Sequence, residues 1–461
     1  MHALATEALV DGAAAPIRLV PVAESAFPVW LETAPGATRQ WAAANGLKGE
    51  AGRHLAIPGA GGAVAEIVVV YDPAQPLWAL AGLPDGLPEG DYALGGDPDG
   101  GLATQMAAGW AIGAYAFTRY RKRRRAPARL VWPAAADRAE ATRLAEAVWL
   151  VRDLVNTPAE DLAPADLAQA AVALGHRHGA EVRVLTGDEL LAQNYPMVHA
   201  VGRGSSRAPC LVDLTWGDPA APKVTLVGKG VCFDSGGYDL KPAAGMKLMK
   251  KDMGGSANVL GLASLLMAGQ RKIRLRVLVP AVENLVSGNA FKPLDVIPTR
   301  KGLTVEIGNT DAEGRLILCD PLAEADSEKP EILIDMATLT GAARVAVGPD
   351  LPAMFCNDER LAADIQAAAA ATGDPVWRMP LWKPYRKWLD SKVADINNVS
   401  ESPFAGSITA ALYLQEFVSP TTPWVHFDMF AWNASARPGR PEGGEAQAIR
   451  ALDRMIADRF G

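Results

Sequence analysis

The stretch "KVTLVGKGVCFDSGG", residues 223–237, is the clearest indication of the fold class in this chain. It begins with a short run of apolar and β-branched residues and ends in a turn-forming "DSGG". The runs that follow, "SANVLGLASLLMAG" at 256–269 and "IRLRVLVPAV" at 273–282, have the lengths of a helix and of a second strand. A strand, a helix and a further strand in this order indicate a parallel sheet covered by helices.

The same alternation continues on both sides of this stretch, from about residue 160 onward. Short apolar runs recur at "EVRVLT", "EILIDMATLTG" and "WVHFDMF", and helical patterns separate them. The sequence therefore predicts an α/β fold with a mixed, largely parallel sheet flanked by helices. We expect two domains, a smaller N-terminal α/β domain at 1–130 and a larger C-terminal α/β domain at 161–461, joined by a linker and interdomain helix at 131–160.

Composition and charge disfavour several classes of protein. With 49% hydrophobic and 21% charged residues, the chain of 461 residues has the composition of a folded protein with a large core. Its net charge of −7 and pI near 5.5 make a role in nucleic-acid binding improbable. The basic run "RYRKRRR", Arg119 to Arg125, is interpreted as an exposed loop near the domain boundary, with a polyanion-binding patch as the alternative.

The cysteines and the apolar runs indicate the cellular compartment in which the protein is expected. The chain has four cysteines without a CxxC pair, which indicates buried thiols in a reducing compartment: Cys210, Cys232, Cys319 and Cys356. The start, "MHALATEALVDGAAAP", lacks the basic segment and apolar core of a signal peptide. No run reaches the roughly 18 uncharged apolar residues of a membrane span. We therefore expect a cytoplasmic protein with no membrane partner.

Charged residues gather where the predicted strands end, which is where sheets of this type bind ligands. The stretch "NTDAEGRL", residues 309–316, carries three of them at every second position. If this stretch is extended, the three side chains face the same way. We expect seven charged residues to meet in one crevice: Lys229, Asp234, Lys241, Asp252, Asp311, Glu313 and Arg315.

Carboxylates packed together repel one another and become protonated unless positive charge holds them. The charge of two divalent cations would balance the four carboxylates of this set, Asp234, Asp252, Asp311 and Glu313. Lys241 and Arg315 would remain as surplus positive charge, suited to a developing oxyanion and a bound anion. Lys229, between two glycines, would lose its proton beside a metal ion and serve as a nitrogen ligand.

Other kinds of site fit this pattern less well. The stretch "VGKGVCF" lacks the spacing of a phosphate-binding loop. Ser235 has neither the surroundings of a GxSxG nucleophile nor a histidine in these motifs, so a turn-forming role is expected. His176 and His178, in "GHRHG", are expected to be solvated at a helix end. Surface salt bridges are another explanation for the carboxylates. The charged residues lie among glycines and apolar strand ends, which argues against that explanation.

Four motifs in the right order, "VGKGVCFDSGG", "KKDMGG", "NTDAEGRL" and "DMATLTGA", resemble the leucyl aminopeptidase family, the cytosol aminopeptidases with two metal ions. The resemblance covers about residues 150–461. It implies a hydrolase that releases the N-terminal residue from short peptides with a free N-terminus, assembled as a homohexamer. It also implies two divalent ions, zinc or manganese with cobalt or magnesium as alternatives, and a bicarbonate ion.

The resemblance also implies a role for each metal ligand. Asp234 and Glu313 would bridge the two ions. Lys229 and Asp252 would complete one metal site, and Asp311 would complete the other through its carboxylate and main-chain oxygens.

The remaining roles concern the substrate. The resemblance implies that Lys241 holds the scissile carbonyl oxygen and that Arg315 binds the bicarbonate, which takes a proton from the attacking water. It implies substrate contacts at Met249, Thr338, Leu339, Gly341, Phe430 and Asn433. Many relatives have a small "IAG" run where this chain has "MFAWN", so Phe430 and Asn433 are expected to narrow or repolarise the pocket for the first side chain.

Two alternatives to a peptidase stay open at the level of sequence. Another two-metal hydrolase, for example one acting on phosphate esters, would use the same set of charged residues. A non-enzymatic protein that binds a polyanion through "RYRKRRR" is the other alternative.

Overall fold

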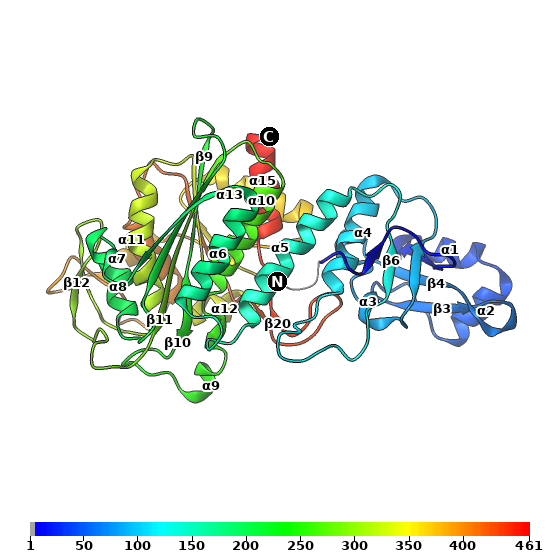
Figure 1. Ribbon diagram of the computed structural model, residues 1–461, viewed down its shortest axis with the longest axis horizontal. Helices are drawn as coiled ribbons and strands as arrows, with labels where there is room; N and C mark the ends of the chain where they lie inside the picture. The colour runs from blue at the N-terminus through cyan, green and yellow to red at the C-terminus, as the bar shows by residue number, and fades with distance from the viewer. Residues whose placement is uncertain (1–4) are drawn as a thin grey trace. The chain divides into compact units, whose positions relative to one another are not determined.

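The computed structural model describes residues 5–461 (Figure 1). The chain divides into two compact units, one formed by the residues up to Trp149 with Ala434–Glu442 and the other by Leu150–Asn433 with Gly443–Gly461. The division falls inside the helix α5, Arg138–Asn156. The expected α/β fold with a smaller N-terminal and a larger C-terminal part is confirmed, whereas the boundaries at 130 and 160 stay a prediction. The first four residues of the N-terminal stretch considered above lie outside the described residues.

The smaller unit is built on a sheet in the order β1-β6-β5-β2-β4-β3. Its strands pair in parallel except β3, which is antiparallel to β4 at one edge. The strands are β1 Leu9–Val10, β2 Ile17–Ala23, β3 His54–Pro58, β4 Val64–Tyr71, β5 Asp91–Leu94 and β6 Arg129–Val131. The helices are α1 Phe27–Thr33, α2 Gly36–Ala44, α3 Leu83–Gly86 and α4 Gly100–Gly113, with short 3₁₀ turns at Glu24–Ala26, Ala60–Gly62 and Pro76–Trp78.

The larger unit is built on a mixed sheet in the order β16-β15-β18-β14-β9-β11-β8-β7, and β10 also pairs with β11. The centre of the sheet, from β18 to β11, is parallel. The strands of this sheet are β7 Glu181–Thr186, β8 Cys210–Trp216, β9 Lys223–Gly228, β10 Gly230–Asp234, β11 Arg274–Asn284, β14 Ile332–Ala337, β15 Ala353–Cys356, β16 Trp377–Arg378 and β18 Trp424–Asp428. Smaller sheets are formed by β12 Val296–Pro298, β13 Thr304–Glu306 and β17 Ile396–Asn397, and by β19 Trp432–Asn433 and β20 Gly443–Gly444.

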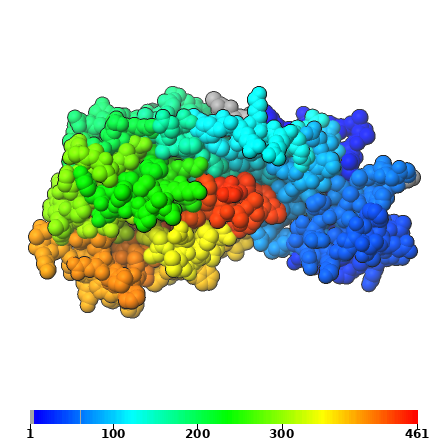
Figure 2. Space-filling view, turned by 90° about the horizontal axis from the view of Figure 1, so that it is seen from below, coloured from blue at the N-terminus to red at the C-terminus, as the bar shows by residue number. Residues whose placement is uncertain are grey.

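Helices cover both faces of the main sheet, as expected for strands that read as nearly continuous apolar runs. The helices α6 and α10 pack on one face, and α8 and α11 pack on the other. The C-terminal helix α15, whose outer surface is red in Figure 2, packs against α10 and α13. The helices are α6 Pro164–His178, α7 Glu189–Ala192, α8 Pro196–Gly202, α9 Ala243–Met246, α10 Gly254–Ala268, α11 Glu313–Ser327, α12 Gly341–Val347, α13 Glu359–Thr372, α14 Gly406–Gln415 and α15 Ile449–Phe460, with 3₁₀ turns η4 Met249–Lys251 and η5 Lys383–Leu389.

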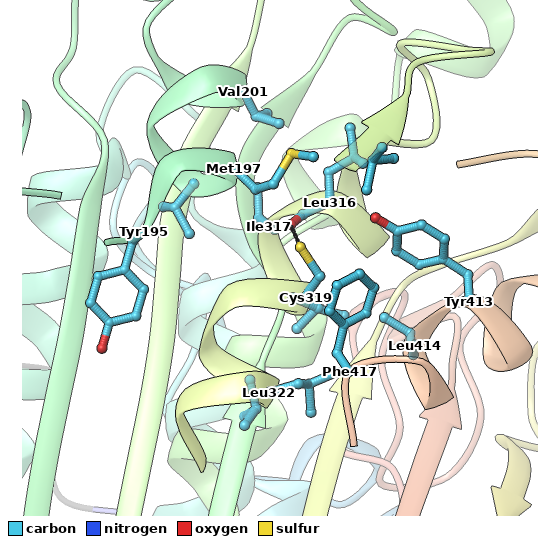
Figure 3. Close-up of a cluster of buried hydrophobic side chains, with 14 of the residues drawn as sticks. Tyr195, Met197, Val201, Leu316, Ile317, Cys319, Leu322, Tyr413, Leu414 and Phe417 are labelled. Atoms are coloured by element: carbon cyan, nitrogen blue, oxygen red, sulfur yellow. Dashed lines mark hydrogen bonds between the residues drawn. The ribbon is translucent and has the colours of Figure 1, made fainter. Parts of the chain in front are cut away.

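A buried apolar cluster fixes α11 against the sheet (Figure 3). Leu316 and Ile317 of α11 point toward Met197 of α8 and Tyr413 of α14. The start of α8 is also fastened to α11 by a hydrogen bond of 2.8 Å from the Met197 amide to Asp320 Oδ2. Burial of such side chains contributes about 1.5–3 kcal/mol each to stability. The cluster therefore holds the first turn of α11 in place. That turn carries two of the charged residues singled out from the sequence.

Three smaller expectations concern the cysteines, the apolar runs and the basic run. The four cysteines are buried and free, as expected. None of the helices that the structure describes is both long and apolar enough to cross a membrane. The basic run forms a mostly exposed loop, as expected. Within this loop, Arg125 donates to the carbonyls of Asp85 and Leu87, and Arg123 lies 3.4 Å from Asp85 Oδ1.

Candidate active site

Lys229 lies between the last residue of β9 and the first residue of β10, at the carboxyl end of β9 in the main sheet. Its amide donates to the carbonyl of Met336 on β14, and its carbonyl accepts from Ser256 on α10. These two bonds fix the lysine backbone between two elements. Gly228 makes this possible, because a β-carbon there would stand 2.7 Å from Ser256 Cα. The flanking glycines noticed in the sequence therefore have a packing reason.

The Lys229 ammonium lies between two carboxylates in the buried interior. Its Nζ is 2.7 Å from Asp252 Oδ2 and 3.0 Å from Glu313 Oε1, and it donates to the carbonyl of Thr338 at 2.7 Å. Asp234, Asp252 and Glu313 each place one carboxylate oxygen within 4.8 Å of the others. The structure therefore brings together three acidic side chains that the sequence places on three separate segments.

A second lysine closes the other side of the cluster. Lys241 Nζ lies 2.7 Å from Asp234 Oδ2 and also pairs with Asp311. The second oxygen of Asp234 accepts from Asn284 Nδ2 at 2.9 Å and from the Gly236 amide at 2.8 Å. Each lysine is therefore shared by two carboxylates, so that two ammonium groups face four acidic side chains.

Burial and the excess of carboxylates over ammonium groups shift the pKa values of the residues in this cluster. Burial raises the pKa of Asp234 well above its ordinary value, and the neighbouring Glu313 and Asp252 raise it further. Burial likewise raises the pKa of Asp252 to about 6, against the opposing effect of Lys229. Burial would lower the pKa of Lys229, but the adjacent carboxylates outweigh burial and raise it. The two ammonium groups therefore do not fully neutralise the four carboxylates.

The chemistry of the donor atoms fits metal ions. Glu313 Oε2 is buried and has no hydrogen-bond partner among the described residues. Asp252 Oδ2 and Asp311 Oδ1 are likewise buried without a hydrogen-bond partner in the described part of the chain, and a lysine ammonium group lies beside each. A buried carboxylate oxygen without a partner is costly, whereas carboxylate oxygens and an amine nitrogen are ordinary ligands of divalent metals. The residues present therefore suit a centre for divalent cations.

The stretch "NTDAEGRL" is not extended, so its three charged side chains do not share one face of a strand. Asp311 lies in a turn, and the helix α11 begins at Glu313. The cause is local, because Asn309 Oδ1 accepts from the Asp311 amide at 2.6 Å and turns the chain. The preceding strand, β13, also belongs to the small sheet and not to the main one. Glu313 reaches the cluster from a helix start instead.

Arg315 is buried, with 7% of its surface exposed, and no ion pair reaches it within the described residues. Its Nη1 donates to the carbonyl of Asn398 at 2.6 Å, and its Nε has no hydrogen-bond partner. Burial lowers the pKa of Arg315. A buried guanidinium without an anion is unfavourable, so this position suits a small anion.

Two asparagines that shape the site escaped the sequence analysis. Asn284 donates to Asp234 and to the Thr310 carbonyl, and it is the last residue of β11. The rule that ligands gather beyond strand ends would have singled it out. Asn398 Oδ1 accepts from the amides of Gly308 and Asn309. No signal in the sequence connects Asn398 to a segment about ninety residues away.

The segment after β14 adjoins the carboxylate cluster. Thr338 Oγ1 donates to Asp252 Oδ1 at 2.9 Å, which fixes the orientation of that carboxylate. Asp428 Oδ1 accepts from the amides of Leu339 and Thr340, both at 3.0 Å, and so holds the turn into α12. Gly341 opens α12 and is exposed. Thr338 therefore adjoins the cluster, and the substrate contacts of Thr338, Leu339 and Gly341 stay a prediction.

The other expected substrate contacts differ in accessibility. Met249 is half-buried at the start of η4. Phe430 is half-buried, and its ring centroid lies 4.5 Å from Lys251 Nζ and 5.2 Å from Arg344 Cζ. Asn433 is only 3% exposed, and its amide donates to Glu445. Phe430 therefore presents more surface beside the cluster than Asn433 does.

Fold and site together define a class of protein, the α/β enzymes with a carboxylate metal centre at the carboxyl edge of the sheet. Two family models match the chain, "Cytosol aminopeptidase family, catalytic domain" over residues 149–452 and "M17 aminopeptidase, N-terminal domain" over residues 16–133. The chain belongs to the cytosol aminopeptidase family, as the sequence motifs indicated. Members of this family are hydrolases with two metal ions that act on peptides with a free N-terminus.

Individual relatives agree with this assignment. Peptidase B of Serratia proteamaculans is 43% identical over 340 residues, which cover 71% of this chain and 78% of that enzyme. The crystal structure of the cytosol aminopeptidase of Coxiella burnetii superimposes with a TM-score of 0.94 at 46% identity, covering 99% of this chain and 100% of that one. The bottromycin maturation enzyme BotP in complex with Mn superimposes with a TM-score of 0.87 at 34% identity, covering 97% and 100%.

Proposed function

We propose that this metal-dependent aminopeptidase releases the N-terminal residue of short peptides by attack of a water molecule, without a covalent intermediate. The observation that carries the proposal is the buried cluster in which Lys229 and Lys241 are each shared by two carboxylates. The unpaired oxygen of Glu313 points to a cation that the lysines do not replace. Neither a histidine base nor a serine nucleophile is part of the arrangement.

Five residues would hold the ions. Lys229 would supply an amine nitrogen, and Asp234, Asp252, Asp311 and Glu313 would supply carboxylate oxygens. When bound, two such ions lower the pKa of a water molecule, orient the substrate and stabilise developing negative charge. The Mn complex of BotP and the mixture of oxygen and nitrogen donors support manganese or zinc, with cobalt and magnesium as alternatives.

Lys241 and Arg315 would act on the substrate and on the water. The carboxylates around Lys241 outweigh burial and raise the pKa of its ammonium, so that it stays protonated. A protonated lysine at this edge would hold the carbonyl oxygen as negative charge develops on it. Arg315 has no anionic partner in the described chain and would hold a bicarbonate ion. Bicarbonate in that position would supply a proton acceptor.

The pocket for the first side chain would be lined by the residues around the turn into α12 and the segment after β18: Met249, Thr338, Leu339, Gly341, Phe430 and Asn433. Phe430 fills part of this space with an aromatic ring, and we therefore do not expect the leucine preference of the family. Asn433 would act on the pocket mainly through its bond to Glu445.

We further propose a cytoplasmic homohexamer. The support for the cytoplasm is the name of the family and of the Coxiella burnetii relative, together with four unpaired cysteines. The support for assembly is the family resemblance alone. Analytical ultracentrifugation at assay concentrations measures it, and a monomer with full activity would contradict the hexamer.

The activity itself is tested with aminoacyl p-nitroanilides and the full-length protein loaded with Mn²⁺ or Zn²⁺. We expect hydrolysis that chelation abolishes, that N-acetylated substrates do not undergo, and that Glu313→Ala lowers by at least about a hundredfold. A phosphate ester assayed with the same metal loading separates the alternative two-metal hydrolase. Hydrolysis of the ester but of no anilide would overturn the proposal. Salt-sensitive polyanion binding that survives Asp311→Ala, without peptidase activity, would favour the binding role.

A further inference from the structure

The loop formed by residues 235–241 joins a carboxylate of the cluster to Lys241. It follows directly on Asp234, the last residue of β10, and it closes on itself because the Lys241 amide donates to the Ser235 carbonyl at 3.0 Å. Gly236 has a φ of 88°, and a β-carbon there would stand 2.5 Å from the carbonyl oxygen of Asp239. This tight turn brings the Lys241 ammonium back to within 2.7 Å of Asp234 Oδ2.

Asp239 fastens this loop to Thr310 by reciprocal hydrogen bonds. Its Oδ2 accepts from the Thr310 amide at 2.7 Å, and its own amide donates to Thr310 Oγ1 at 2.9 Å. The Thr310 hydroxyl donates to the Gly236 carbonyl at 2.7 Å, and Asp239 Oδ2 lies 3.0 Å from the same hydroxyl. The loop is therefore paired with the residue that directly precedes Asp311 of the cluster.

Thr310 is the fixed partner in this pairing. It is fully buried, and its carbonyl accepts from Asn284 Nδ2 at 3.0 Å, so it is anchored to the end of β11. The loop, in contrast, carries the exposed side chains of Tyr238 and Leu240. The loop therefore takes its position from Thr310, and Asp239 is the loop residue whose carboxylate makes the connection.

Lys241 needs a fixed backbone once cations are bound beside it. In the described chain its ammonium pairs with Asp234 and Asp311. Carboxylates that hold cations attract an ammonium group less strongly, because the cations neutralise their charge. The side chain of a lysine is flexible, with four carbons between its backbone and its charge. The position of the loop backbone then decides where the ammonium of Lys241 can lie.

We propose that Asp239 is a positioning residue for Lys241. The proposal rests on the aminopeptidase function proposed above, in which Lys241 holds the carbonyl oxygen of the substrate. The bonds of Asp239 to Thr310 fix residues 236–239, and the closing bond at Ser235 passes this position on to Lys241. Without the carboxylate the loop would shift, and a displacement of about 1 Å at a catalytic group costs on the order of a hundredfold in rate.

A double-mutant cycle tests whether Asp239 acts through Lys241. Both kcat and KM are measured on one aminoacyl p-nitroanilide for the Mn²⁺-loaded full-length wild type, Asp239→Ala, Lys241→Ala and the double variant. We expect Asp239→Ala to lower kcat by about tenfold or more and to leave KM within about twofold. In the Lys241→Ala background the same substitution should change kcat by less than about twofold, because the group that it positions is gone.

Further variants separate the hydrogen bond from the charge and from the loop as a whole. Asp239→Asn keeps an oxygen that accepts from the Thr310 amide and should retain most of the wild-type kcat. Asp239→Ser is too short to keep both bonds and should follow Asp239→Ala, so the cycle can be completed with either variant. Tyr238→Phe is the matched control, because it removes a hydrogen bond of 2.8 Å from the same loop to the Ser287 carbonyl on the exposed side and should leave kcat unchanged.

Hydrogen exchange on the metal-free protein supplies a readout that is independent of activity. Asp239→Ala should speed exchange of the Thr310 amide and of the loop amides, since their hydrogen bonds are lost, and should leave the amides of α11 protected as in the wild type. Bound metal per chain should also stay at the wild-type level. The Asp311 amide keeps its own bond of 2.6 Å to Asn309 Oδ1, which does not involve the loop.

Several outcomes overturn the inference. The same loss of kcat from Asp239→Ala in both backgrounds would mean that Asp239 supports the whole site and not Lys241. A parallel loss of bound metal would mean that the link orients Asp311 instead. Asp239→Asn as impaired as Asp239→Ala would assign the effect to charge. An active wild type with an unaffected Asp239→Ala would refute the positioning role alone, whereas a wild type that hydrolyses no anilide would overturn the proposed function itself.

Discussion

Gly314 lies against the side chain of Lys229. A β-carbon built on Gly314 would stand 2.7 Å from Lys229 Cε and 2.8 Å from Lys229 Nζ, closer than real β-carbons approach other atoms. Gly314 is the second residue of α11, so its missing side chain lets the helix start come up to the lysine. The glycine in "DAEGR" therefore leaves room for Lys229 Nζ to lie 3.0 Å from Glu313 Oε1.

Gly314→Ala is expected to displace the Lys229 side chain and to weaken the metal centre. Misplacement of a ligand by about 1 Å costs on the order of a hundredfold in rate, so kcat/KM should fall by about that factor. Elemental analysis should find less bound metal per chain. Gly86→Ala is the control, because no atom lies within 4 Å of a β-carbon there. Full metal content and activity in Gly314→Ala would show that the lysine is free to move.

Lys241→Ala is expected to lower kcat without removing metal. Lys241 is the lysine that the proposed mechanism assigns to the carbonyl oxygen, and loss of one such donor costs about 10²–10³ in kcat. Bound metal per chain should stay at the wild-type level, since the ions themselves would neutralise Asp234 and Asp311. Lys241→Arg should recover part of the activity. A parallel loss of metal and activity in Lys241→Ala would instead indicate that the lysine supports the centre.

Chelation is expected to lower both activity and thermal stability. Ions that bind the folded protein alone stabilise it by mass action, by about 2.7 kcal/mol per site at a hundred times the dissociation constant. Addition of Mn²⁺ after removal of the chelator should restore Tm and activity together. Glu313→Ala, which lacks the unpaired carboxylate oxygen, should show a smaller metal-dependent shift of Tm. Differential scanning calorimetry with and without chelator measures the Tm of the wild type and of the variant. A wild-type Tm that does not respond to metal would contradict a buried centre.

The central strands and the members of the charged cluster could be predicted because they depend on local pattern. The runs "KVTLVG" and "EILIDMA" are mostly apolar, and a strand covered on both faces favours that composition. The charged residues stand out because burial of so many carboxylates needs a chemical reason. Their contacts were predictable only as a group, since the sequence does not show which lysine pairs with which carboxylate.

The remaining features depend on contacts between distant segments. "NTDAEGRL" alternates like a strand, yet the Asp311 amide donates to Asn309 Oδ1 in a turn, and a helix begins at Glu313. The segment Ala434–Glu442 belongs to the smaller unit although it lies between β19 and β20, which belong to the larger one. Its Arg440 stacks over Trp78, with Cζ 4.1 Å from the ring. Pairings of this kind arise in the folded chain and leave no periodic pattern in the sequence.

His426 and Asp335 form a buried ion pair in the main sheet. They are cross-strand neighbours on β18 and β14, with His426 Nδ1 2.6 Å from Asp335 Oδ1. Trp424 Nε1 donates to the second oxygen of Asp335 at 2.7 Å. Burial would lower the pKa of His426, but the Asp335 carboxylate outweighs it and raises the pKa above the ordinary value of 6.5.

The pH dependence of stability follows from the sign of this shift. Because the folded pKa of His426 lies above the unfolded one, the contribution of the pair is fully present below about pH 6.5 and is lost as the pH rises through the folded pKa. His426→Gln should therefore destabilise the protein most below about pH 6.5, by about 3–5 kcal/mol, since it leaves Asp335 buried without its cation. The difference between variant and wild type should shrink at higher pH, where the wild-type histidine also loses its charge. Urea denaturation at a series of pH values measures this, with His176→Gln, an exposed histidine at the end of α6, as the control. A difference that stays constant with pH would mean that His426 contributes through packing and not through its charge.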